Sequence, residues 1–236
     1  MKKVSRFVPA LLIAAGIVVL GLCIKGGIDN MAFRDRQVAV RGLCEREVPA
    51  NRVTWPIMFT ETGNDLITIY DKYNRTCKTV VKFLRENGID STEITVGTTP
   101  SIYDQTSNRY ASDNFRFNYS ITGTVTVVSS KVDQVRALMS RQTELLKEGV
   151  ALNTDNYQAQ ATYEYTGLNS IKPDMIAEAT RNAREAAAKF AADSDSRLGK
   201  IKTASQGQFS IENRDETSPF IKNVRVVTTI VYYLED

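Results

Sequence analysis

The chain opens with an apolar stretch of membrane length. Residues 7–24 carry no charged side chain, whereas residues 1–6 contain two lysines and an arginine. About 18 apolar residues are close to the lower limit for a helix that crosses a bilayer. We therefore predict a transmembrane anchor or signal segment at residues 7–24, after a basic tip at residues 1–6.

The charges on either side of this stretch predict its orientation. The basic tip outnumbers Lys25, the one charge that closely follows the stretch. Positive charge favours the cytoplasmic side, which predicts a single pass through the inner membrane, with the N-terminus in the cytoplasm and the C-terminal domain in the periplasm. A cleaved signal peptide has the same layout. A third interpretation is a lipoprotein cleaved before Cys23, although Leu22 is bulky for that position.

Strand-like alternation begins after a polar linker, residues 25–35, that contains a glycine pair. Val38, Val40 and Gly42 fall on one face and their neighbours on the other. Pro49 and a nearby asparagine are turn residues, and the segment after them is rich in β-branched and aromatic residues. This pattern predicts a β-hairpin.

Three later segments have the apolar spacing of amphipathic helices: residues 65–87, 131–148 and 173–194. The first has a capping residue, Asp65, at its start and a glycine, Gly88, at its end. The third begins with a proline and has a face made mostly of alanine.

The segments between these helices alternate and are predicted to be strands. The order after the transmembrane helix is therefore ββαββαβαββ, an α+β fold in which antiparallel or mixed sheets are packed by three amphipathic helices. We assign all of these elements to one exported domain, residues 36–236.

Composition narrows the chemistry of this domain. The chain has 236 residues, 42% of them hydrophobic and 24% charged, as is ordinary for a globular protein. It has no histidine, which excludes histidine-based triads and removes the commonest metal ligand. Its three cysteines cannot build a Cys/His zinc site. The net charge of +3, with basic residues spread along the sequence, gives no argument for nucleic acid.

Several short runs together resemble the SIMPL-domain family. These are "VAVRGLCERE" and "VPANRVTW" near the start of the domain, "LRENGIDSTEIT" at the end of the first helix, and "ATRNAREAAAKFA" followed by "LGKI". The resemblance covers roughly residues 36–236 with the order of the runs preserved. The sequence departs from the usual pattern at Cys44, where small residues are commoner, and at Asn51, where aspartate is commoner.

The resemblance implies export, an α+β fold and, for at least one member, a large ring- or channel-like oligomer. The family includes a bacterial oxidative-stress-defence protein and a periplasmic immunogenic antigen. It implies no established catalytic residues, so no residue is given a catalytic, cofactor-binding or metal-binding role.

Cys44 and Cys77 are the first candidate pair. The alternation places Cys44 on the buried face of its strand, and Cys77 lies on the apolar stripe of the helix expected to cover the same sheet. A disulfide between them is predicted as one outcome in an oxidising compartment. The alternatives are two small buried hydrophobes or a reactive thiol.

Two further sets of residues are candidates. Glu45 and Glu47 share a face and are either a carboxylate pair for acid–base chemistry or charges that protect a sheet edge, which we favour. Small side chains on the third helix either pack within the monomer or contact another subunit. The residues of this predicted subunit contact are Ala179, Ala183, Ala186, Ala187 and Phe190.

These patterns lead to one functional hypothesis and one alternative. The first is a non-enzymatic, membrane-anchored envelope protein that self-assembles, with a link to oxidative or envelope stress that rests on the resemblance alone. Its partners would be the inner membrane, through residues 7–24, and further copies of itself, without cofactor or nucleic acid. The alternative is a periplasmic binding module for a small apolar ligand or a protein partner.

Overall fold

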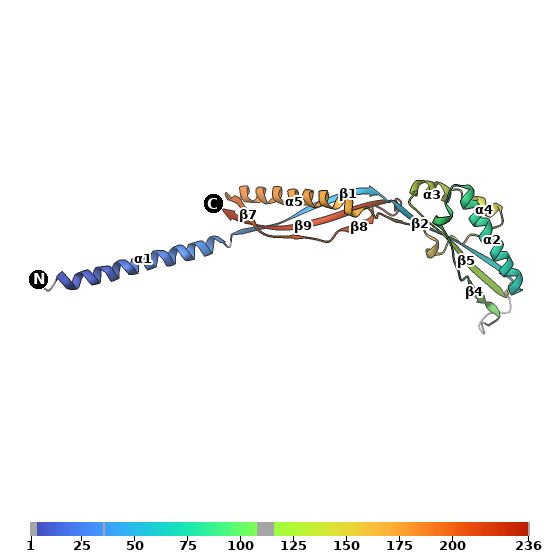
Figure 1. Ribbon diagram of the computed structural model, residues 1–236, viewed down its shortest axis with the longest axis horizontal. Coiled ribbons are helices and arrows are strands. Elements are labelled where there is room, and N and C mark those ends of the chain that lie inside the picture. The colour runs from blue at the N-terminus through green and yellow to red at the C-terminus, as the bar shows by residue number, and fades with distance from the viewer. Residues whose placement is uncertain (1–3, 35, 108–115, 236) are drawn as a thin grey trace. The chain divides into compact units, whose positions relative to one another are not determined.

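The protein is an α+β chain in a computed structural model that describes residues 4–34, 36–107 and 116–235 (Figure 1). The described elements are, in chain order, α1 (Val4–Arg34), β1 (Gln37–Pro49), β2 (Arg52–Gly63), α2 (Leu66–Glu86), the 3-10 helix η1 (Ser91–Glu93), β3 (Ile94–Val96), β4 (Ser101–Asp104), η2 (Gln105–Ser107), β5 (Tyr119–Ser129), α3 (Val132–Met139), α4 (Thr143–Lys147), η3 (Tyr157–Ala159), β6 (Thr162–Glu164), α5 (Leu168–Asp193), β7 (Arg197–Gln206), β8 (Ser210–Asn213) and β9 (Ile221–Glu235).

The N-terminal apolar stretch forms the helix α1. Its segment Leu11–Ile28 has a mean hydropathy of 2.3, none of it is buried by the rest of the chain, and it is long and apolar enough to cross a membrane. The helix continues to Arg34, so most of the predicted linker is helical. A helix that has already formed gains a backbone hydrogen bond with each added residue, and a glycine costs only about 1 kcal/mol relative to alanine.

The chain folds into two compact units. The first comprises Met1–Arg46, Asn169–Ser210 and Val224–Asp236, and the second comprises Glu47–Leu168 and Ile211–Asn223. Because boundaries fall inside β1, β8 and β9, each of these strands contributes to both units.

The first unit contains the strand order β1-β9-β7, with β8 also paired to β9. One face of β9 is buried from Val224 to Tyr232 at every second residue. Helix α5 packs on β1: a Cβ added at Gly42 would lie 1.8 Å from the carbonyl oxygen of Ala179. The sequence needs glycine here because the helix backbone lies directly on the strand.

The second unit contains the order β3-β5-β2-β6, with β4 also paired to β5. The long strands β2 and β5 are antiparallel from Val53 opposite Ser129 to Gly63 opposite Tyr119. Helix α2 packs on both strands, and its apolar stripe enters one core with Phe59 and Ile121. This stripe and its capping residue, Asp65, confirm the helix predicted from the sequence.

The predicted hairpin is wrong. β1 pairs with β9, whereas β2 pairs with β5 and β6 in the other sheet. Alternation fixes which face of a strand is buried but does not identify its neighbour. At this turn the backbone N–H of Ala50 donates to Phe220 and that of Asn51 donates to Glu164, so the chain leaves one sheet and enters the other.

Three other features differ from the prediction. The helix predicted at residues 131–148 is divided into α3 and α4, because the hydroxyl of Ser140 donates to the carbonyl of Ala137 and the backbone tightens to bonds between residues three apart. Helix α5 begins at Leu168, before Pro173. The helix tolerates the proline because its missing N–H removes only one hydrogen bond near the helix start. The described residues contain more strands than predicted because β4 and β8 are separate short strands.

Candidate functional site

Both cysteines of the candidate pair are buried free thiols. Cys44 lies on the covered face of β1, as the alternation predicts. Burial raises the pKa of Cys44, and the neighbouring Glu178 raises it further. Burial also raises the pKa of Cys77, although its hydrogen bond with Tyr73 acts in the opposite direction. Both thiols are therefore protonated at neutral pH, the form that is a poor nucleophile.

Cys44 and Cys77 belong to different units of the chain. The expectation that the helix of Cys77 covers the sheet of Cys44 is wrong, because α2 packs on β2 and β5, whereas β1 pairs with β9. The disulfide stays a prediction that thiol labelling can test.

The small residues of α5 divide between its buried and exposed sides. Ala179, Ala183 and Ala187 are fully buried within the first unit, and Ala186 is half-buried. Phe190 is 60% exposed. The buried alanines already serve to bring α5 close to β1, so a subunit contact on this helix would use the side that carries Phe190.

The two glutamates of β1 are each held by an arginine. Glu45 forms an ion pair with Arg225 at 3.4 Å, and Glu47 forms one with Arg214 at 3.6 Å. These pairs lie on a strand at the end of its sheet. Charges at that position oppose uncontrolled pairing of the edge with other strands.

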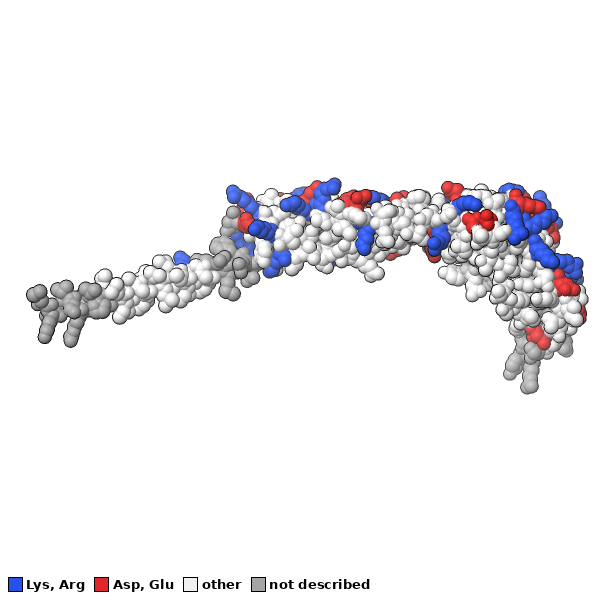
Figure 2. Space-filling model, viewed as in Figure 1, with Lys and Arg blue, Asp and Glu red and all other residues white. Residues whose placement is uncertain are grey.

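A basic surface on α2 was missed in the sequence. The helix carries two carboxylates and five cations, and all five cations are exposed: Lys72, Arg75, Lys78, Lys82 and Arg85. Their spacing of three and four residues gathers them on one side of the helix. Figure 2 shows Lys and Arg concentrated over the part of the second unit where Figure 1 places α2. The spacing of these cations could be seen in the sequence, but the basic residues were judged over the whole chain, where they are spread out, and not helix by helix.

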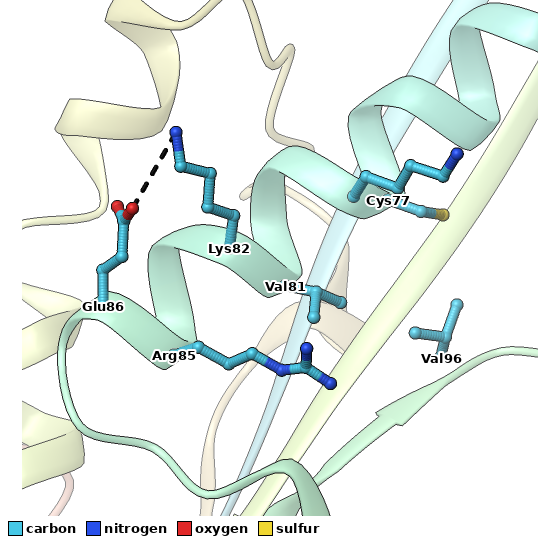
Figure 3. A pocket seen from close by; sticks show the side chains of 7 residues that line it. Cys77, Val81, Lys82, Arg85, Glu86 and Val96 are labelled. Atoms are coloured by element: carbon cyan, nitrogen blue, oxygen red, sulfur yellow. Dashed lines mark ion pairs between the residues drawn. The ribbon is translucent and has the colours of Figure 1, made fainter.

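This basic surface borders an apolar depression of about 400 Å³, which we call the basic groove. Its residues are Cys77, Lys78, Val81, Lys82, Arg85, Glu86 and Val96. In Figure 3 the side chains of Val81, Val96 and Arg85 point toward a shared space, while Lys82 and Glu86 point away as an ion pair. Sequence reasoning could not assemble the groove, because Val96 comes from β3 and the other residues come from α2.

A second cavity, of about 660 Å³, contains a buried amine. Lys222 is 7% exposed, and its Nζ donates to the Oδ1 of Asn213. Burial lowers the pKa of Lys222, and the negative charge of Glu164 opposes this change. An ammonium has three donors, and Asn213 accepts from one of them.

The described residues contain no group of three Cys, Asp or Glu side chains that could hold a metal ion. The described residues thus offer two distinct candidate cavities, the apolar depression flanked by cations and the cavity lined in part by a buried lysine.

The family model described as "SIMPL: Protein of unknown function (DUF541)" matches residues 38–227. A comparison with curated proteins finds no match.

Proposed function

Because the chain belongs to the SIMPL family, we propose that it is a non-enzymatic, membrane-anchored envelope protein whose exported domain self-assembles. The apolar helix α1 supports the anchor, and the basic residues before it favour a cytoplasmic N-terminus at the inner membrane with the domain in the periplasm. A role in tolerance of oxidative or envelope stress rests on the family resemblance.

The main observation in support of self-assembly is the edge of β1 that pairs with no other described strand. This strand has 13 residues, and β9 is its one partner strand among the described elements. The carbonyl of Arg36 accepts from Leu234 of β9. Because carbonyl direction alternates along a strand, the odd-numbered carbonyls from Gln37 onward point away from β9. A long edge of unpaired backbone groups is a template for another strand.

The charges along this edge are complementary to those of a second copy. If two β1 strands pair antiparallel with Leu43 opposite Leu43, each Arg41 lies opposite the Glu45 of the partner copy. Opposite charges directly across two strands stabilise the pairing. Arg41 is exposed and forms no ion pair with any described residue, so its charge is available.

One backbone carbonyl at the centre of this edge already accepts a hydrogen bond. The side-chain amide of Asn182 on α5 donates to the carbonyl of Leu43 at 2.8 Å. A carbonyl oxygen has two lone pairs, so a strand can bond to the same group without displacing the amide. The Asn182 side chain beside this carbonyl therefore favours a strand that fits around it over pairing with any other strand.

The test measures the mass of the full chain in detergent by light scattering. The wild type should be larger than one copy. Arg41→Glu or Glu45→Arg should each reduce the mass, because each places like charges opposite one another. An equal mixture of the two variants should recover the larger mass, since the glutamates at positions 41 and 45 of one copy then face arginines in the other. Lys147→Glu, an exposed charge change on α4, is the matched control.

A wild type that is monomeric overturns self-assembly. If the wild type assembles and neither variant reduces its mass, the protein self-assembles through a contact other than the β1 edge.

A further inference from the structure

The basic groove has positive charge that the protein itself does not neutralise. Lys82 pairs with Glu86 at 3.8 Å. Lys78 and Arg85 flank the apolar floor and form no ion pair with any described residue. Uncompensated charge of one sign around a depression attracts ligands of the opposite sign.

The floor of the groove is apolar and accessible. Val96 is 39% exposed, and Val81 is half-buried beside it. The volume of about 400 Å³ is enough for one or two aliphatic side chains. An acidic ligand with apolar side chains would therefore fit better than a simple inorganic anion.

One wall of the groove is a strand with a free edge. β3 is the last strand in the order β3-β5-β2-β6 and pairs with β5 through Ile94–Val96. Its other edge has no partner strand among the described elements. A helix beside a free strand edge can receive an extended peptide, whose backbone adds to the sheet while alternate side chains enter pockets.

We propose that the basic groove binds an extended acidic segment of another protein. The segment adds alongside β3, directs carboxylates toward Lys78 and Arg85, and places an aliphatic side chain against Val81 and Val96. The free strand edge favours a peptide over a lipid headgroup, which has no strand to add. This surface lies on α2 and β3, so it is separate from the β1 edge proposed for self-assembly.

The test uses the full chain in uncharged detergent and a fluorescent heptapeptide, Glu-Ser-Leu-Ser-Glu-Ser-Leu, in which glutamate and leucine fall at every second residue and so share one face of an added strand. Binding is followed by anisotropy and should weaken as salt is raised, because exposed charges are screened. Lys78→Glu and Arg85→Glu should each weaken binding by about five- to tenfold, the size expected when an attractive rim pair becomes repulsive. Lys189→Glu, which reverses an exposed charge on α5, should bind as the wild type does.

A second set of measurements examines the apolar floor and the alternatives. Val96→Thr keeps a β-branched residue and should weaken binding by about threefold, as should exchange of leucine for serine in the peptide. A lysine–leucine peptide should not bind.

Equal binding of the acidic and basic peptides, or equal affinity of Lys78→Glu and Lys189→Glu, overturns the proposal. Binding to vesicles that contain phosphatidylglycerol, without binding to the peptide, also overturns it and assigns the groove to a membrane surface. Loss of the oligomer in Arg41→Glu with peptide binding intact separates this proposal from self-assembly.

Discussion

Thr228 lies within β9 and is 5% exposed, and its hydroxyl has no hydrogen-bond partner among the residues that the structure describes. A buried hydroxyl that has lost water without gaining a partner is destabilising. Ser129 is the opposite case in the other unit: its hydroxyl donates to Glu93 at 2.7 Å and accepts from the backbone N–H of Lys131 at 3.0 Å. Two buried hydroxyls thus contribute to stability with opposite signs.

We expect Thr228→Val to raise the free energy of unfolding by about 1 kcal/mol, since valine has nearly the same shape and needs no partner. Ser129→Ala should lower it by about the same amount, because Glu93 and Lys131 lose a partner. The measurement is the urea midpoint of the full chain in detergent. A Thr228→Val midpoint below that of the wild type would show that the hydroxyl is satisfied, for example by water.

At the scale of elements, the carboxylate of Glu93 links the 3-10 helix η1, which precedes β3, to the end of β5. Glu93 in η1 accepts from the backbone N–H of Asp90 at 3.0 Å, which completes a capping box, and from the hydroxyl of Ser129. Lys131 lies 3.5 Å away. The hydrogen bond from Ser129, followed by the one from Asp90 and the charge of Lys131, holds the pKa of Glu93 below its ordinary value, against the effect of burial.

This shift predicts a pH dependence of stability. A folded-state pKa below the unfolded value means that the ionised group stabilises the fold above the unfolded value, and that this stabilisation disappears as the pH falls through the folded pKa. Glu93→Gln should therefore lose less stability than the wild type on acidification below pH 4.5, the ordinary value. Urea midpoints across this range measure the difference. Glu185→Gln, which removes an exposed carboxylate on α5, should follow the wild type; a parallel curve for Glu93→Gln would refute the assignment.

The sequence predicts elements better than it predicts their neighbours. The helix at residues 65–87 follows from its apolar stripe and its capping residue, which are local features. The face of β1 that carries Cys44 also follows from local alternation. The partner of β1 does not, because β9 lies at the far end of the chain and no local signal names it. The basic groove was missed for the same reason, since Val96 joins it from another element.

At the scale of the whole molecule, each unit has one buried cysteine and a tightly packed glycine close to it in the fold. In the first unit, a Cβ at Gly42 would lie 1.8 Å from a backbone oxygen of α5, and Cys44 lies two residues further along β1. In the second, a Cβ at Gly123 would lie 2.4 Å from the ring of Tyr73, and Cys77 lies on the same helix as that tyrosine. Matched substitutions can therefore ask whether the units open independently.

We expect Gly42→Ala to speed maleimide labelling of Cys44 by at least about fivefold and to leave Cys77 unchanged, with the reverse for Gly123→Ala. Forcing a methyl group into such contacts costs about 1–3 kcal/mol, and local opening rises in proportion. The variants are made in a Cys23→Ser background, because Cys23 is exposed. If both thiols speed up together in either variant, the two units open as one. If neither thiol reacts until reductant is added, Cys44 and Cys77 are bonded in the exported protein, as the sequence predicted for one outcome.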